Sequence, residues 1–151
     1  MDPKKINNEV ESSKEEEIGQ KSVVELLKEN VVDLLYPSES DEKLKVIDWQ
    51  ADHPAPFSTI LFRKYIGLTP ADRVESVPWE RFFDVVLTEK DWWTDVEKSR
   101  AERFAKIKAI VQENLSELEY FRAGRVEIEA YLVGKDYEGK WKGLKTLIIE
   151  S

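Results

Sequence analysis

The last third of the chain, LEYFRAGRVEIEAYLVGKDYEGKWKGLKTLIIES (residues 118–151), decides the fold. Apolar and polar residues alternate along it, and four glycines divide it into segments. Alternation with a period of two is the pattern of a strand with one buried face. One side of the central segment carries Val126, Ile128, Ala130 and Leu132, and the other carries Glu127, Glu129 and Tyr131. We therefore predict an antiparallel meander with one face against helices.

Three upstream segments have apolar residues at helical spacing and would cover this sheet. The first is Lys21–Tyr36, which we expect to end there because Pro37 follows. The second is 78–87, in which the proline suits the first turn and Phe82, Phe83, Val86 and Leu87 face inward. The third begins at Thr94 or Asp95 as the capping residue. Its apolar stripe consists of Phe104, Ile107, Ile110, Val111 and Leu115.

The remaining segments are shorter. Alternation over Lys43–Trp49 predicts a strand, and Val74–Val77 fits a second short strand. The stretch Ser58–Ile66 is ambiguous, but it fits a helix that ends at Gly67. Prolines in residues 51–57 predict a loop. Together these elements predict an α+β fold, in which helices cover a mostly antiparallel sheet and the last strand ends at the terminus.

The chain of 151 residues fits one domain preceded by a tail. Residues 1–20 contain no aromatic residue and six acids against three bases, so we predict a disordered acidic tail and a single folded domain over residues 21–151. The net charge of −8 leaves −5 on that domain. Such a surface repels nucleic acids and anionic membranes and favours a basic partner.

Targeting signals and catalytic residues are scarce. We see no apolar leader and no apolar run near the length of a membrane span, and so expect a soluble, cytoplasmic protein. With His53 as the only histidine and no cysteine, Cys–His catalysis and multi-histidine metal sites are excluded. A Ser–His–Asp triad is formally possible, but no serine lies in a nucleophile-elbow pattern. Glu127 and Glu129 have the spacing of paired carboxylates, although solvated strand carboxylates opposite lysines are commoner. We expect neither an enzyme nor a bound cofactor.

Three features remain as candidates for binding. Ser38–Ser40 lies in an acidic stretch that suits a cation or an arginine, although such loops are usually only solvated. In Asp91–Trp93, two adjacent tryptophans diverge, so one is expected at the surface, where tryptophan is enriched in binding hot spots. The terminal Glu150–Ser151 follows an apolar strand directly, and its oxygens are the hard donors that Mg²⁺ or Ca²⁺ prefers.

At these residues the chain resembles the nuclease A inhibitor family, small acidic proteins that block sugar-non-specific ββα-metal endonucleases. The resemblance is carried by LLYPSES (Leu34–Ser40), DWWTDVE (Asp91–Glu97) and FRAGRVEIEAYLVG (Phe121–Gly134). It continues through a glycine-containing turn to a terminal strand that stops at a hydroxyl residue after glutamate. The likeness runs from Ser22 to Ser151 and is weakest between Ala51 and Val77.

The resemblance implies an α/β/α sandwich that inhibits a nuclease. In that family the loop after the first helix, the D-W loop and the C-terminus form the contact surface, and the terminal hydroxyl is directed at the nuclease's catalytic metal. Carried over, Glu39 is the acidic anchor, Trp92 the aromatic contact and Ser151 the metal-directed group. The implied partner-binding set is Glu39, Lys90, Asp91, Trp92, Glu150 and Ser151, and Ser151 would meet a metal only through the partner. We expect a monomer when the protein is free.

Two positions differ from the family pattern. Ser151 stands where the pattern has threonine, which keeps the hydroxyl and loses a methyl group. Lys90 stands where the pattern has glutamine, and it places a cation opposite a groove that should be basic. An alternative is therefore an interaction module with the same fold and no nuclease target, and a metal-assisted hydrolase is a third hypothesis.

Overall fold

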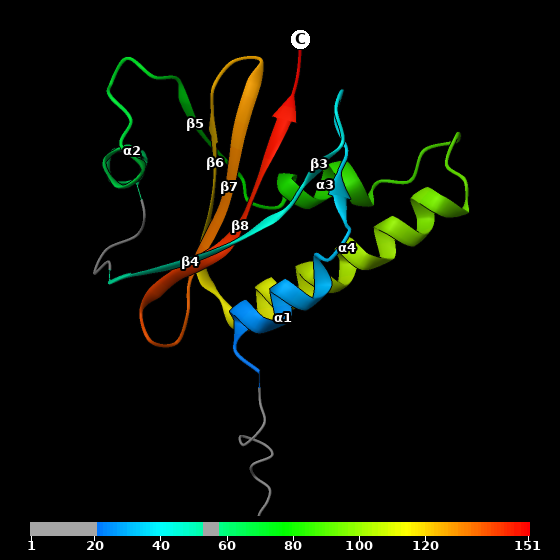
Figure 1. Ribbon diagram of the computed structural model, residues 1–151, viewed down its shortest axis with the longest axis horizontal. Helices are drawn as coiled ribbons and strands as arrows, with labels where there is room; N and C mark the ends of the chain where they lie inside the picture. The colour runs from blue at the N-terminus through cyan, green and yellow to red at the C-terminus, as the bar shows by residue number, and fades with distance from the viewer. Residues whose placement is uncertain (1–20, 53–57) are drawn as a thin grey trace, which may run out of the picture.

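The computed structural model describes residues 21–52 and 58–151. The predicted disorder of residues 1–20 and the predicted proline-rich loop around His53 lie outside this part of the chain, and the domain boundary at residue 21 stays a prediction. At the centre is a five-stranded antiparallel sheet with the strand order β4-β8-β7-β6-β5 (Figure 1). Its strands are β4 (Lys45–Asp52), β5 (Val74–Val77), β6 (Ser116–Ala123), β7 (Glu127–Lys135) and β8 (Lys140–Ile149).

The predicted meander is confirmed, because β6, β7 and β8 follow one another in the chain and pair in that order. Strand β8 pairs with β7 along its length, from Glu127↔Ile149 to Lys135↔Trp141. The two backbones come very close at Gly143, where an added Cβ would lie 1.8 Å from the Leu132 carbonyl oxygen. Only glycine fits such an approach. Because β8 also pairs with β4 on its other side, it is an interior strand of the sheet.

Three helices cover one face of the sheet (Figure 1): α1 (Val23–Asn30), α3 (Arg81–Leu87) and α4 (Asp95–Asn114). Their side chains and those of the sheet form a shared core that includes Leu27, Phe82, Phe104, Ile107 and Leu132. Thr94 caps α4 through a capping box with Glu97, as its sequence predicts. Helix α3 begins at Arg81 and not at Pro78, because residues 79–80 form a turn.

Helix α2 (Thr59–Ile66) covers part of the opposite face, which makes the fold an α/β/α sandwich. Its Phe62 is fully buried and stacks on Phe121 of β6 at a centroid distance of 4.4 Å. Gly67 ends α2 in the left-handed conformation, as predicted. Tyr131, predicted on the polar face, is buried because it packs against Phe62, whereas Val126 lies before β7 and is 50% exposed.

The predicted helix over Lys21–Tyr36 is too long. Helix α1 ends at Asn30, and residues 35–36 form the strand β2 (Leu35–Tyr36), which pairs with β3 (Glu42–Lys43). Tyr36 is buried, and its hydroxyl donates a hydrogen bond of 2.6 Å to the Phe82 carbonyl oxygen. This tertiary contact overrides the local helical spacing. The strand predicted over residues 43–49 lies instead at 45–52.

Candidate functional site

The C-terminal end of β8 is held from both sides. The Ile149 amide donates to Ser38 Oγ at 3.0 Å, and its carbonyl oxygen accepts from the Glu39 amide at 3.3 Å. One residue further, the Glu150 amide donates to the Val126 carbonyl oxygen at 2.9 Å. These bonds tie the terminus to the loop after β2 and to the β6–β7 turn. The chain therefore emerges from the sheet in a fixed direction, next to the β2–β3 hairpin (Figure 1).

Glu39 receives the last residue of the chain through two hydrogen bonds. The Ser151 amide donates to Glu39 Oε2 at 2.9 Å, and the Ser151 hydroxyl donates to Glu39 Oε1 at 2.7 Å. Both hydrogen bonds lower the pKa of the Glu39 carboxyl below its usual value, and the one from the Ser151 amide has the larger effect. Because the hydroxyl donates its proton, its oxygen keeps lone pairs for another group. We call Glu39, Glu150 and Ser151, all exposed to solvent, the terminal tip.

Arg122 of β6 holds the terminal tip in place through an ion pair with Glu150. Its Nη2 lies 2.7 Å from Glu150 Oε1, and its Nε lies 3.9 Å from Glu75 Oε1 on β5. Burial works against the charged guanidinium, but the hydrogen bond to Glu150 and the neighbouring charges raise the pKa of Arg122. Arg122 is not among the site residues predicted from the sequence. The available signal was an arginine between the apolar residues Phe121 and Ala123 of a strand, since a half-buried cation needs a carboxylate partner.

The predicted D-W segment lies on a different connection, between α3 and α4. Lys90, Asp91 and Trp92 are exposed there, and Trp92 is 67% exposed, whereas Trp93 is partly buried. One tryptophan of the pair is thus at the surface, as the sequence predicts. Figure 1 shows this connection at the far end of α4, with the β2–β3 hairpin between it and the C-terminus. The structure therefore bonds Ser151 to Glu39, with Glu150 next to Ser151 in the chain, and holds residues 90–92 on a separate segment.

A hollow of about 440 Å³ opens beside the terminal tip, between α3 and the end of β8. Glu39 and Glu150 belong to its rim, together with Arg81 and Val85 of α3. Tyr36 and Tyr120 contribute to its walls. The tip is thus the edge of a larger concave surface, which we call the tip-side hollow.

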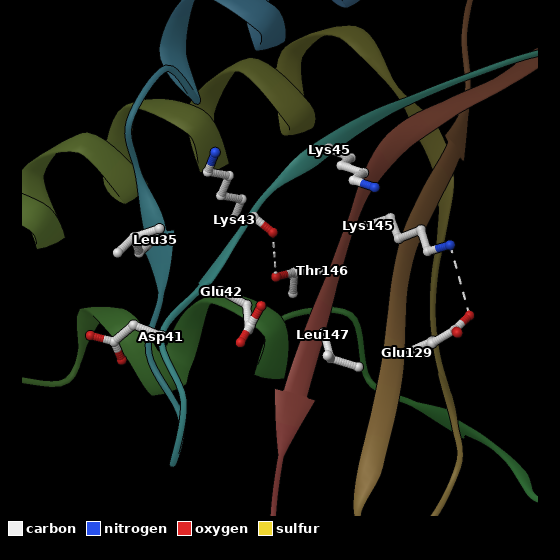
Figure 2. A pocket seen from close by; sticks show the side chains of 9 residues that line it. All are labelled: Leu35, Asp41, Glu42, Lys43, Lys45, Glu129, Lys145, Thr146 and Leu147. Atoms are coloured by element: carbon white, nitrogen blue, oxygen red, sulfur yellow. Dashed lines mark hydrogen bonds and ion pairs between the residues drawn. The ribbon is translucent and has the colours of Figure 1, made fainter.

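A second hollow, of about 530 Å³, lies between β3 and β8 (Figure 2). Lys145 pairs there with Glu129 at 3.8 Å, and the Thr146 hydroxyl donates to the Lys43 carbonyl oxygen at 2.8 Å. Figure 2 shows Asp41 and Lys43 pointing away from that ion pair, so the charged groups do not converge on one point. Within residues 21–52 and 58–151, no three acidic or histidine side chains are grouped to hold a metal ion.

The fold and the terminal tip define an α/β/α sandwich that presents carboxylates and a hydroxyl on a rigid terminal strand. The family model described as "Nuclease A inhibitor-like protein" matches residues 21–151. Since this match spans most of the chain, the protein belongs to the nuclease A inhibitor-like family, as the resemblance implies. Comparison with the curated proteins found no match. Among the helices in the described part of the chain, none has the length and apolar character needed to cross a membrane.

Proposed function

We propose that this protein inhibits a sugar-non-specific ββα-metal endonuclease by inserting its terminal tip into the active-site cleft. In this complex the Ser151 hydroxyl is directed at the catalytic metal of the nuclease. The observation that carries the proposal is the pair of hydrogen bonds from Ser151 to Glu39, at the end of a strand held in the sheet interior. Family membership supports a nuclease as the partner.

Pre-organisation is the physical basis of the proposed binding. A free chain end would lose conformational freedom when it docks, and that loss weakens association. Here the terminus is already ordered by Ser38, Glu39, Arg122 and Val126, so less entropy is lost. Serine supplies the same hydroxyl oxygen as threonine for contact with a metal, and the hydrogen bond to Glu39 already fixes the orientation of the Ser151 hydroxyl. We therefore expect Ser151 to replace threonine with little loss of affinity.

Charge and an exposed aromatic residue support the same proposal. The acidic tip suits the basic groups that bind phosphates in a nuclease cleft, and complementary charge speeds association. Trp92 offers a large exposed ring for a second contact, flanked by Asp91 and Lys90. We expect the free protein to be a cytoplasmic monomer that binds neither a cofactor nor nucleic acid directly.

The alternative is an interaction module of the same family without a nuclease target. Lys90 favours it, because an exposed cation beside Trp92 opposes a basic groove. Lys90 lies on the connection between α3 and α4 and does not contact the terminal tip. A nuclease inhibitor and an interaction module would therefore share this fold and differ only in the partner that they bind. Direct measurement of nuclease activity separates them.

The test is a titration of the full-length protein into a ββα-metal nuclease, with cleavage of duplex DNA as the readout. We expect stoichiometric loss of cleavage, which deletion of Ser151 and the change Glu39→Ala both weaken while the melting temperature stays nearly constant. Glu138→Ala is the matched control, because this exposed glutamate lies in the β7–β8 turn. Unchanged cleavage at excess protein would favour the module without a nuclease target, and equal inhibition by all variants would reject the terminal tip.

A further inference from the structure

The tip-side hollow is contiguous with the terminal tip. It is bounded by Glu39 and Glu150 on one side and by Arg81 and Val85 of α3 on the other. A partner that receives Ser151 in a cleft therefore also faces this hollow. Its volume of about 440 Å³ is large enough for at least one side chain of the partner.

Most polar groups in the walls of the hollow have partners inside the protein, and Arg122 Nε, which has no hydrogen-bond partner among the described residues, is buried away from solvent. The Tyr36 hydroxyl donates to the Phe82 carbonyl oxygen at 2.6 Å, and Arg122 bonds both Glu150 and the Tyr120 hydroxyl. A polar group entering the hollow would lose its hydration and gain little in return, because the Tyr36 hydroxyl is already bonded and Arg122 Nε is not accessible from the hollow. An apolar group loses nothing in this way and gains from burial. The hollow therefore favours an apolar side chain.

The rim on α3 adds an apolar contact and a charge. Val85 is 59% exposed and lies one helical turn after Arg81, so both side chains are on the same face of α3. Among the described residues, the Arg81 guanidinium has no ion-pair partner. An acidic group of the docking molecule would meet this cation, while its basic groups would meet Glu39 and Glu150. The charges thus fix the orientation in which the partner docks.

We infer that the Arg81–Val85 face of α3 and the tip-side hollow form a second part of the docking surface, which receives an apolar side chain of the nuclease that stands beside a carboxylate. This inference rests on the proposed function and names a contact that neither the terminal tip nor the D-W segment supplies. It extends the interface across α3, where the hydrophobic contact excludes water from the charged tip.

Two charge-introducing variants test this surface. Val85→Glu places a carboxylate at the mouth of the hollow, and Arg81→Glu reverses the charge on its rim. Val32→Glu is the matched apolar control, because Val32 is 57% exposed and follows α1. Lys106→Glu is the matched charge control, on the exposed side of α4. Val85→Ala is included because it removes the contact without adding a charge.

The inhibition constant for a ββα-metal nuclease and the melting temperature are measured for all five variants. We expect Val85→Glu and Arg81→Glu to raise the inhibition constant about tenfold or more, which corresponds to the loss of one hot-spot contact. Val85→Ala should cause a smaller increase, and the two controls should stay within about twofold of the unmodified protein. All five should melt close to the unmodified protein, because each site is exposed.

The outcomes separate this inference from the proposed function. If the unmodified protein inhibits and deletion of Ser151 weakens it, while Val85→Glu and Arg81→Glu inhibit normally, the second surface is rejected and the terminal tip stands. If the two controls weaken inhibition as much as the α3 variants, the effect is one of general charge and the inference is also rejected. If the unmodified protein does not inhibit, the proposed function fails and this inference fails with it.

Discussion

Replacing Arg122 by glutamine should loosen Glu150 and Ser151 but leave β8 in the sheet, because β8 stays paired with β7 up to Ile149. The guanidinium binds Glu150 at 2.7 Å and lies 3.9 Å from Glu75, and its side chain is only 20% exposed. Breaking a fully buried ion pair costs about 3–5 kcal/mol, whereas an exposed pair contributes about 0–1 kcal/mol. The two carboxylates are about half exposed, at 52% and 49%, so water compensates part of the loss. We therefore expect Arg122→Gln to cost about 1–2 kcal/mol.

A double-mutant cycle by urea unfolding measures this contribution. Arg122→Gln, Glu150→Gln and the double variant should show a coupling energy of about 1 kcal/mol, because the two side chains touch. The melting temperature of Arg122→Gln should fall by about 2–8 °C for a chain of this size. Two results would refute the role of Arg122 as an anchor. One is that the changes in unfolding free energy of the two single variants add up to that of the double variant, and the other is that Arg122→Gln is as stable as the unmodified protein.

Positioning of the terminus is tested separately from stability. Lys135→Gln is the control, because it removes the 3.0 Å ion pair between Lys135 and Glu117 at the opposite end of β7. The Lys135 side chain is 21% exposed and that of Glu117 is 40% exposed, close to the values for Arg122 and Glu150. We expect Arg122→Gln to weaken nuclease inhibition more than Lys135→Gln at equal loss of stability. Arg122→Lys should restore part of the inhibition, since it returns a cation near Glu150. If the Arg122 and Lys135 variants weakened inhibition equally, Arg122 would contribute to stability only and would not position the terminus.

Three further changes have defined outcomes. Because the folded pKa of Glu39 is lowered, its bond to Ser151 adds a small stabilisation above the ordinary glutamate pKa, and this stabilisation is lost as the pH falls through the folded value. Glu39→Gln should therefore show a smaller drop in melting temperature between pH 7 and pH 3 than the unmodified protein, and an equal drop would contradict the bond. Phe62→Ala should cost about 3–5 kcal/mol in urea unfolding, because this buried ring stacks on Phe121, and a near-neutral result would mean that α2 does not stabilise the sheet. Trp92→Ala should leave the melting temperature unchanged, since the ring is 67% exposed, but raise the inhibition constant about fivefold or more, and unchanged inhibition would remove Trp92 from the interface.

The sequence predicts those parts of the fold that local patterns control. Alternation in residues 118–151 gave the meander, and the apolar stripe and the Thr94 cap gave helix α4. Both follow from backbone geometry, because a period of two or of 3.6 residues puts apolar side chains on one side of an element. The helical spacing of apolar residues wrongly predicted a helix up to Tyr36. This residue lies in a strand, and its ring packs against Phe82 and Phe104.

The candidate site divides in the same way. The sequence by itself determined that the last strand runs to the terminus and that Glu39, Trp92 and Ser151 are chemically suited to bind a partner. Only the tertiary structure decided that Glu39 and Ser151, 112 residues apart, bond each other, and that Arg122 holds Glu150. Hydrogen bonds and ion pairs act over a few ångströms in space, and residues far apart in the chain come within that range only when the sheet brings their strands together.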